Sequence, residues 1–127
     1  MNQEIWLMRH GEPQKNGSLT QNGVQQSREA AKVFQGHEIV IYSSPAPRCL
    51  ETAALLNVEI AQSVVHVIPW LNISTVFPED CLSFLKGEIV VVVSHGPTLC
   101  KLAEILTLSS DHSADFDYAV PVKFYCA

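Results

Sequence analysis

Runs of apolar residues alternate along the chain with segments whose apolar residues recur at helical spacing. The apolar runs predict strands over residues 4–8, 38–44, 64–68 and 88–94, and a last strand over about 118–125. The run over 88–94 is apolar at almost every position, which is typical of a strand that is covered on both faces. Pro121 lacks a backbone donor, so the last strand is expected at an edge of the sheet.

Apolar residues spaced three and four positions apart predict helices between these strands. The helices are expected over about 20–34, 46–56 and 98–106, with a short one over 79–86. In the first helix, Thr20 is expected to act as the N-cap and Gly36 to end the helix. In the second, Leu50, Ala53 and Ala54 are expected to form the buried face.

Strands that are separated by helix-length segments form βαβ units, in which the strands run parallel. The predicted fold class is therefore α/β, a three-layer sandwich with a mostly parallel central sheet and helices on both faces. A chain of 127 residues is near the common domain size, and no linker divides it. Residues 1–127 are expected to form a single domain.

Composition narrows the choice of partners. Hydrophobic residues make up 47% of the chain and charged residues 17%, which favours a folded globule. The net charge of −5 argues against nucleic acid, because duplex binding relies on a basic surface. We find no signal peptide and no membrane-spanning run, so no membrane partner is expected and a cytoplasmic location is predicted. The cysteines are too scattered for a zinc site or a disulfide framework: Cys49, Cys81, Cys100 and Cys126.

Polar residues follow three of the predicted strands at the point where each strand ends. They are Arg9-His10-Gly11 after the first strand, Ser44 and Arg48 after the second, and His95-Gly96 after the fourth. The carboxyl ends of parallel strands meet at one edge of a sheet, where ligands bind in α/β folds, so these residues are expected to share a pocket. Two guanidinium groups suit a phosphate, and the helix N-termini that follow add backbone N–H donors.

Several segments, in this order, resemble motifs of the histidine phosphatase superfamily, the phosphoglycerate mutase-like proteins. They are LMRHGE at the first strand end, LTQNGVQQSREAA at the first helix, IYSSPAPRCLETAALL across the second strand and helix, and VVVSHGPTLCKL across the fourth strand and last helix. The similarity covers most of the chain, and each motif falls on a predicted strand–turn–helix junction.

The resemblance implies a metal-independent phosphatase without a cofactor. It implies that His10 is the nucleophile and forms a phosphohistidine intermediate, while Arg9, Arg48 and His95 hold and polarise the phosphoryl group. Gly11, Ser44 and Gly96 are the candidate substrate-binding positions beside them. Arg48 on its own admits a second interpretation, as a surface residue paired with Glu51 or Glu29.

The histidines admit a competing interpretation as metal ligands. His10 and His95 could share an ion, but no third ligand stands at a comparable strand end, and two arginines would repel a cation. No metal is therefore expected. His37, His66 and His112 stand in settings typical of structural or surface residues.

The sequence departs from the family where many members carry a glutamate that protonates the leaving group. At the corresponding place, Leu71 is followed two positions later by Ile73 rather than by an acid. Candidate proton donors are Glu12, Glu79 and Asp80.

A phosphohistidine releases its imidazole without a strong acid, so a phosphohistidine protein is the expected substrate. The chain is short and has no lid insertion, as in the small bacterial phosphohistidine phosphatases that it resembles. Two alternatives stay open. One is a phosphatase for a small phosphomonoester, such as a sugar phosphate or alpha-ribazole phosphate, and the other is a phospho-ligand binding module without turnover.

Overall fold

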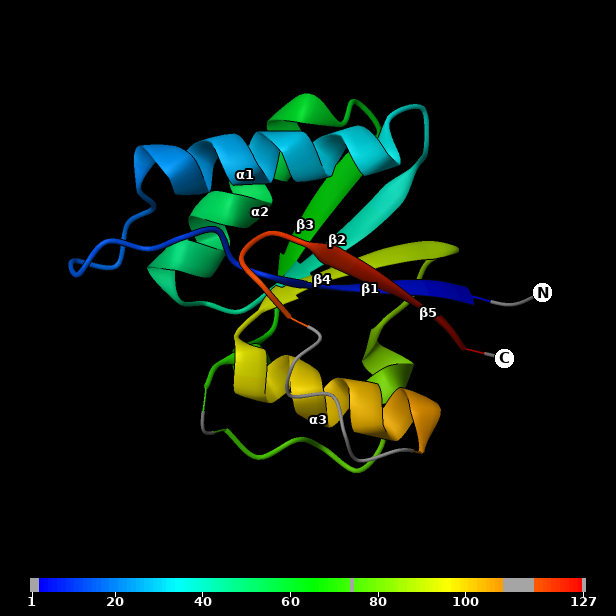
Figure 1. Ribbon diagram of the computed structural model, residues 1–127. Helices are drawn as coiled ribbons and strands as arrows, with labels where there is room; N and C mark the ends of the chain where they lie inside the picture. Colours follow the sequence, from blue (N-terminus) through cyan, green and yellow to red (C-terminus); the bar gives the residue numbers. More distant parts are fainter. Residues whose placement is uncertain (1–2, 74, 109–115, 127) are drawn as a thin grey trace.

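A five-stranded sheet and three α-helices make up most of the described part of the chain. The computed structural model describes residues 3–73, 75–108 and 116–126 (Figure 1). In chain order the elements are β1 (Gln3–Arg9), α1 (Gln21–Ala31), the 3₁₀ turn η1 (Lys32–Phe34), β2 (Ile39–Ser43), α2 (Pro47–Glu59), β3 (Ser63–Val67), the 3₁₀ turns η2 (Pro69–Leu71) and η3 (Cys81–Phe84), β4 (Ile89–Ser94), α3 (Gly96–Thr107) and β5 (Pro121–Cys126).

The strands lie in the order β3-β2-β4-β1-β5. The first four in the chain pair in parallel, and β5 runs antiparallel to β1 at the edge of the sheet. Figure 1 shows α1 and α2 on one face of the sheet and α3 on the other. The predicted α/β sandwich is thus confirmed, and so is the edge position of the strand that Pro121 begins.

Strand β4 supplies the centre of two hydrophobic cores, one on each face of the sheet. Val90 and Val92 pack in the core that contains Leu102 of α3. Val91 and Val93 pack in the core formed with α1 and α2. All four valines are fully buried. Successive side chains of a strand point to opposite faces, so an uninterrupted apolar run is what this central position requires.

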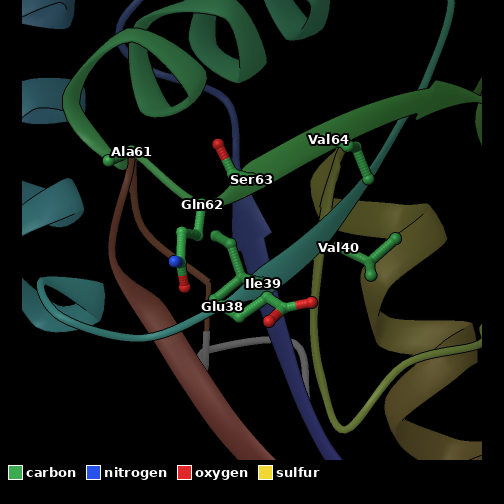
Figure 2. Close-up of a pocket in the computed structure, with 7 residues that line it drawn as sticks. All are labelled: Glu38, Ile39, Val40, Ala61, Gln62, Ser63 and Val64. Atoms are coloured by element: carbon green, nitrogen blue, oxygen red, sulfur yellow. The ribbon is translucent and has the colours of Figure 1, made fainter.

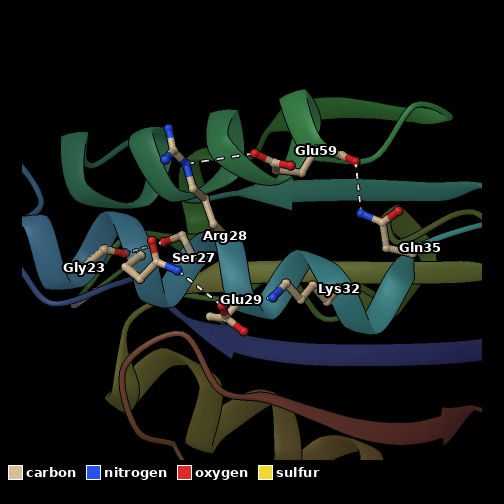
Figure 3. Close-up of polar contacts among 8 residues, drawn as sticks. Gly23, Ser27, Arg28, Glu29, Lys32, Gln35 and Glu59 are labelled. Carbon is tan, nitrogen blue, oxygen red and sulfur yellow. Dashed lines mark hydrogen bonds and ion pairs between the residues drawn. The ribbon is translucent and has the colours of Figure 1, made fainter.

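Helix α1 begins at the predicted cap and lies beside α2. The backbone N–H of Gly23 donates to the Thr20 hydroxyl at 2.9 Å. On the surface, Arg28 of α1 approaches Glu59 of α2 at 3.9 Å (Figure 3), an exposed pair that contributes little to stability. Gly36 follows η1 with φ of 81°, a left-handed conformation that glycine adopts easily. Among the described residues, no helix has the length and hydropathy that a bilayer span requires.

Two details of the prediction were wrong. Helix α2 buries Cys49, Thr52, Ala53 and Leu56, whereas Leu50 and Ala54 are exposed. The helix carries apolar residues on several of its faces, so their spacing alone did not define which face meets the sheet. The short helix over 79–86 is only the turn η3, because so short a segment gains little from helix formation in isolation.

Candidate active site

Strands β1, β2 and β4 end at the same level of the sheet. Arg9 pairs with Ser94, and Ser43 pairs with Val93. The backbone continues this register past the strands, since the N–H of His10 donates to the Ser94 carbonyl at 3.1 Å. The parallel register therefore brings together the three strand ends that the sequence singled out.

His10 and His95 lie close together at this edge of the sheet. Their ring centroids are 5.5 Å apart and the rings are inclined by 68°. Both residues are nearly inaccessible to solvent, with 3% of His10 and 5% of His95 exposed. Neither side chain is a solvated loop residue.

A backbone contact fixes the tautomer of the neutral His10 ring. Its Nδ1 lies 2.8 Å from the carbonyl oxygen of Gly11. A carbonyl oxygen can only accept, so the proton of a neutral imidazole resides on Nδ1 and the lone pair on Nε2. The pKa of His10 is lowered to about 4, mainly by burial. The contact with the Gly11 carbonyl raises the pKa, whereas the charges of His95, Arg9 and Arg48 lower it further. At neutral pH the ring thus presents an unprotonated nitrogen.

His95 is held by Ser44, which follows β2, and by Cys49 of α2. Its Nε2 lies 3.1 Å from the Ser44 hydroxyl oxygen and 3.7 Å from the Cys49 sulfur. Burial lowers the pKa of His95, and Arg48 and Arg9 lower it further. Burial also raises the pKa of the Cys49 thiol to about 12, so this sulfur is a protonated neighbour rather than a thiolate nucleophile.

The two arginines of the site are not neutralised by carboxylates within the described residues. The Nε atoms of Arg9 and Arg48 are buried and have no hydrogen-bond partner there. Neither alternative partner of Arg48 holds it, because Glu51 accepts from the Leu19 N–H at 2.9 Å and Glu29 pairs with Lys32. Two partly buried arginines without a carboxylate partner among the described residues form a cationic environment, which favours an anionic ligand.

Thr52 links the loop after β1 to helix α2. The Gly11 N–H donates to its hydroxyl oxygen at 3.0 Å, and the hydroxyl donates to the Arg48 carbonyl at 2.8 Å. A Cβ atom on Gly11 would lie only 2.6 Å from the Gly23 carbonyl, so α1 leaves no room for a side chain there. Gly96 begins α3, where an added Cβ would lie 4.0 Å from Arg9 Nε. Sequence reasoning missed Thr52, because a threonine in a helix carries no local signal for such a link.

The candidate proton donors have different surroundings. A carboxylate oxygen of Glu12 accepts from the Thr20 hydroxyl at 2.9 Å, which ties it to the start of α1. Glu79 and Asp80 are exposed and precede η3. The Asp80 carboxylate accepts from the Ser83 hydroxyl at 3.2 Å. Neither Glu79 nor Asp80 is among the groups that shift the pKa of His10 or His95.

The other histidines lie apart from this cluster. His37 is exposed, and His66 is exposed on β3 where its ring stacks on Tyr42 at 5.4 Å. His112 lies outside the described residues. Within the described ranges, no three His, Cys, Asp or Glu side chains are grouped to hold a metal ion.

A separate hollow of about 390 Å³ lies between the starts of β2 and β3 (Figure 2). Residues 38–40 and 61–64 line it, and Glu38 is the ionisable one among them. Because β2 and β3 run parallel, this hollow is at the opposite end of the sheet from His10. The Glu38 carboxylate in its lining does not favour a phosphate there.

The lowered pKa of His10 predicts a specific dependence of stability on pH. Between the unfolded value of 6.5 and the folded value of about 4, the unfolded chain binds more protons, so the free energy of unfolding falls as the pH falls. His10→Asn cannot take up this proton. Between these two pH values, the free energy of unfolding of the variant should therefore fall by about 1–3 kcal/mol less than that of the wild type. Urea unfolding at several pH values measures the difference. His37→Asn, at an exposed position, is the control, and equal slopes for His10→Asn and the wild type would contradict the prediction.

Comparison with known proteins identifies the family. Residues 5–71, more than half of the chain, match the model of the histidine phosphatase superfamily, branch 1. No curated protein is similar enough to count as a match.

Solved structures share the fold. A phosphoserine phosphatase from Entamoeba histolytica, in complex with 3-phosphoglyceric acid, aligns over 95% of this chain and 89% of its own, with a TM-score of 0.71 and 21% identity. An Escherichia coli protein provisionally assigned as an alpha-ribazole-5′-P phosphatase aligns over 98% and 94%, with a TM-score of 0.70 and 19% identity. The protein histidine phosphatase SixA, complexed with tungstate, aligns over 81% and 76%, with a TM-score of 0.61 and 24% identity.

The family match covers the first strand end with its Arg9-His10 pair and the segment that carries Arg48. The fold brings both to His95, which comes from a later part of the chain. The resemblance drawn from the sequence motifs is confirmed: the chain belongs to branch 1 of the histidine phosphatase superfamily and is a phosphatase.

Proposed function

We propose that the protein hydrolyses its substrate through a covalent phosphohistidine on Nε2 of His10, without a metal or an organic cofactor. The observation that carries this proposal is the 2.8 Å contact between His10 Nδ1 and the Gly11 carbonyl. It assigns the proton to one ring nitrogen and the nucleophilic lone pair to the other, at a residue whose pKa is lowered to about 4.

In the first step, Nε2 of His10 attacks phosphorus and the bond from phosphorus to the leaving group breaks. Arg9 and Arg48 hold the phosphoryl oxygens, on which charge spreads in the transition state, and the N-terminus of α3 adds backbone donors. In the second step, water attacks the phosphohistidine, the nitrogen–phosphorus bond breaks, and phosphate leaves with a proton. The resting nitrogen of His10 is then free for another cycle.

A phosphohistidine protein is the proposed substrate. An alkoxide leaving group needs a proton donor, whereas imidazole leaves readily without one. Of the candidate donors, Glu12 accepts a hydrogen bond from Thr20, and Glu79 and Asp80 are exposed and shift the pKa of neither site histidine. The similar fold of SixA, a protein histidine phosphatase, supports the same substrate class.

A small phosphomonoester is the second candidate. The phosphoserine phosphatase in complex with 3-phosphoglyceric acid aligns with nearly the whole of this chain. Glu12 follows His10 by two positions, and its carboxylate accepts from the Thr20 hydroxyl. If that carboxylate contacted the leaving group instead of Thr20, it could protonate an alkoxide, which would favour this candidate. A binding module without turnover is the third, and it has no observation in its favour beyond the unassigned proton donor.

The test is a comparison of turnover in excess EDTA. We expect a phosphohistidine protein to be cleaved with a kcat/KM higher than that of para-nitrophenyl phosphate or phosphoserine, by a factor on the order of 10²–10⁴, which is the usual contribution of a general acid. Faster cleavage of phosphoserine would show that the substrate is a phosphomonoester, and it would leave the proposed phosphohistidine mechanism intact. A strict requirement for metal would overturn the mechanism, and binding without any cleavage would favour the binding module.

A further inference from the structure

Tyr118 lies against the arginine and the histidine that end β1. The guanidinium carbon of Arg9 is 4.2 Å from the centroid of the Tyr118 ring. The ring centroid of His10 is 5.8 Å from that of Tyr118. Tyr118 comes from the far end of the chain, just before β5, and sequence reasoning did not select it.

The backbone at Tyr118 and Ala119 pairs with the backbone of the same two residues, Arg9 and His10. Arg9 and Tyr118 form a β-bridge. The N–H of Ala119 lies within hydrogen-bond distance of two carbonyls, 2.9 Å from that of Arg9 and 3.2 Å from that of His10. Ala119 has φ of 54°, in the left-handed region that alanine rarely adopts. A strained residue whose N–H faces the carbonyls of both site residues indicates that the position of Tyr118 is tightly specified.

An aromatic ring is a suitable neighbour for an arginine that binds phosphate. Within the described residues, no carboxylate lies in ion-pair range of Arg9, and its Nε has no hydrogen-bond partner. A carboxylate would neutralise the guanidinium and compete for its N–H donors. A ring attracts the cation through its face and leaves the donors at the guanidinium edge available to an anion.

We infer that Tyr118 is a positioning residue of the anion site, whose ring holds the Arg9 guanidinium in the orientation that binds phosphoryl oxygens. The inference deepens the proposed function and rests on it, because it assumes that Arg9 binds the phosphoryl group. The ring restricts Arg9 before the ligand arrives, so less conformational freedom is lost on binding. The hydroxyl group of Tyr118 has no part in this role.

The test measures binding of tungstate by titration calorimetry, independently of turnover. Tyr118→Leu keeps an apolar side chain but removes the ring, and should weaken tungstate binding about 2- to 30-fold, the range that cation–π energies imply. Tyr118→Phe should restore the affinity of the wild type. Tyr125→Leu is the matched control, because Tyr125 is on β5, is 58% exposed and contacts Lys123 instead. Its substitution should leave tungstate binding unchanged.

A second background separates positioning from general packing. In Arg9→Met, which lacks the guanidinium, Tyr118→Leu should cause no further loss of tungstate affinity. A loss of the same size in both backgrounds, or a Tyr118→Leu variant that binds like the wild type, would overturn the inference and leave the proposed function intact. A wild-type protein that neither binds tungstate nor turns over phosphate compounds would overturn both.

Discussion

His10→Asn is expected to lower kcat/KM by a factor on the order of 10⁴ or more, as the loss of a catalytic nucleophile does in other hydrolases. Asparagine is chosen because its side-chain N–H can replace Nδ1 as donor to the Gly11 carbonyl, a contact of 2.8 Å in the wild type. It supplies no nucleophilic lone pair in place of Nε2. The variant should therefore fold and bind phosphate while failing to cleave. Steady-state kinetics with para-nitrophenyl phosphate and with a phosphohistidine protein measure the loss.

His37→Asn is the matched control for this substitution, since His37 is exposed and outside the site. Its kinetics should equal those of the wild type. A His10→Asn variant that keeps its fold and retains a tenth or so of wild-type turnover would mean that another group attacks phosphorus.

Arg48→Met is expected to raise KM and lower kcat together, reducing kcat/KM by about 10²–10³-fold, as the removal of one transition-state donor does elsewhere. Methionine keeps an apolar stem in this partly buried position and removes the guanidinium. The charge matters in both states of the reaction, because no carboxylate among the described residues shares it and the Nε has no partner there. Initial rates over a range of substrate concentrations separate the two parameters.

Arg28→Met is the control for Arg48→Met. Arg28 is a surface arginine on α1 whose contact with Glu59 is 3.9 Å long, and its loss should leave both parameters unchanged. An Arg48→Met variant with wild-type kcat and KM would remove Arg48 from the proposed anion site.

That the candidate site residues at the strand ends lie together could be predicted, because the sequence next to each of them indicates where a strand ends. Arg9, His10 and His95 follow apolar runs directly, and parallel pairing then brings the ends of those runs to one edge. The burial of β4 on both faces could be predicted for a similar reason, since a strand that is apolar at almost every position is typical of one covered on both faces.

Residues that join the site through distant contacts could not be predicted. Tyr118 reaches Arg9 from more than a hundred positions away, and its own segment shows only a weak strand pattern. Thr52 is one of several polar residues in helix α2, and its contact depends on where the loop after β1 places Gly11. Leu50 and Ala54 were assigned to the wrong side of α2 because apolar residues occupy several faces of that helix.

The proton donor illustrates the same limit of local patterns. Glu12 follows the Arg9-His10 pair closely, and nothing in the sequence indicates that its carboxylate accepts from Thr20. Nearness in the chain thus identified a candidate but not its partner. For the predicted phosphohistidine substrate, the imidazole leaving group makes such a donor dispensable.

The most direct measurement is to trap the phosphoenzyme by rapid quenching during turnover and to identify the phosphorylated atom. We expect an acid-labile, base-stable phosphate on Nε2 of His10, because Nδ1 donates its hydrogen to the Gly11 carbonyl. A phosphate found on Nδ1 or on another residue, or turnover that proceeds with no phosphoenzyme at all, would contradict it.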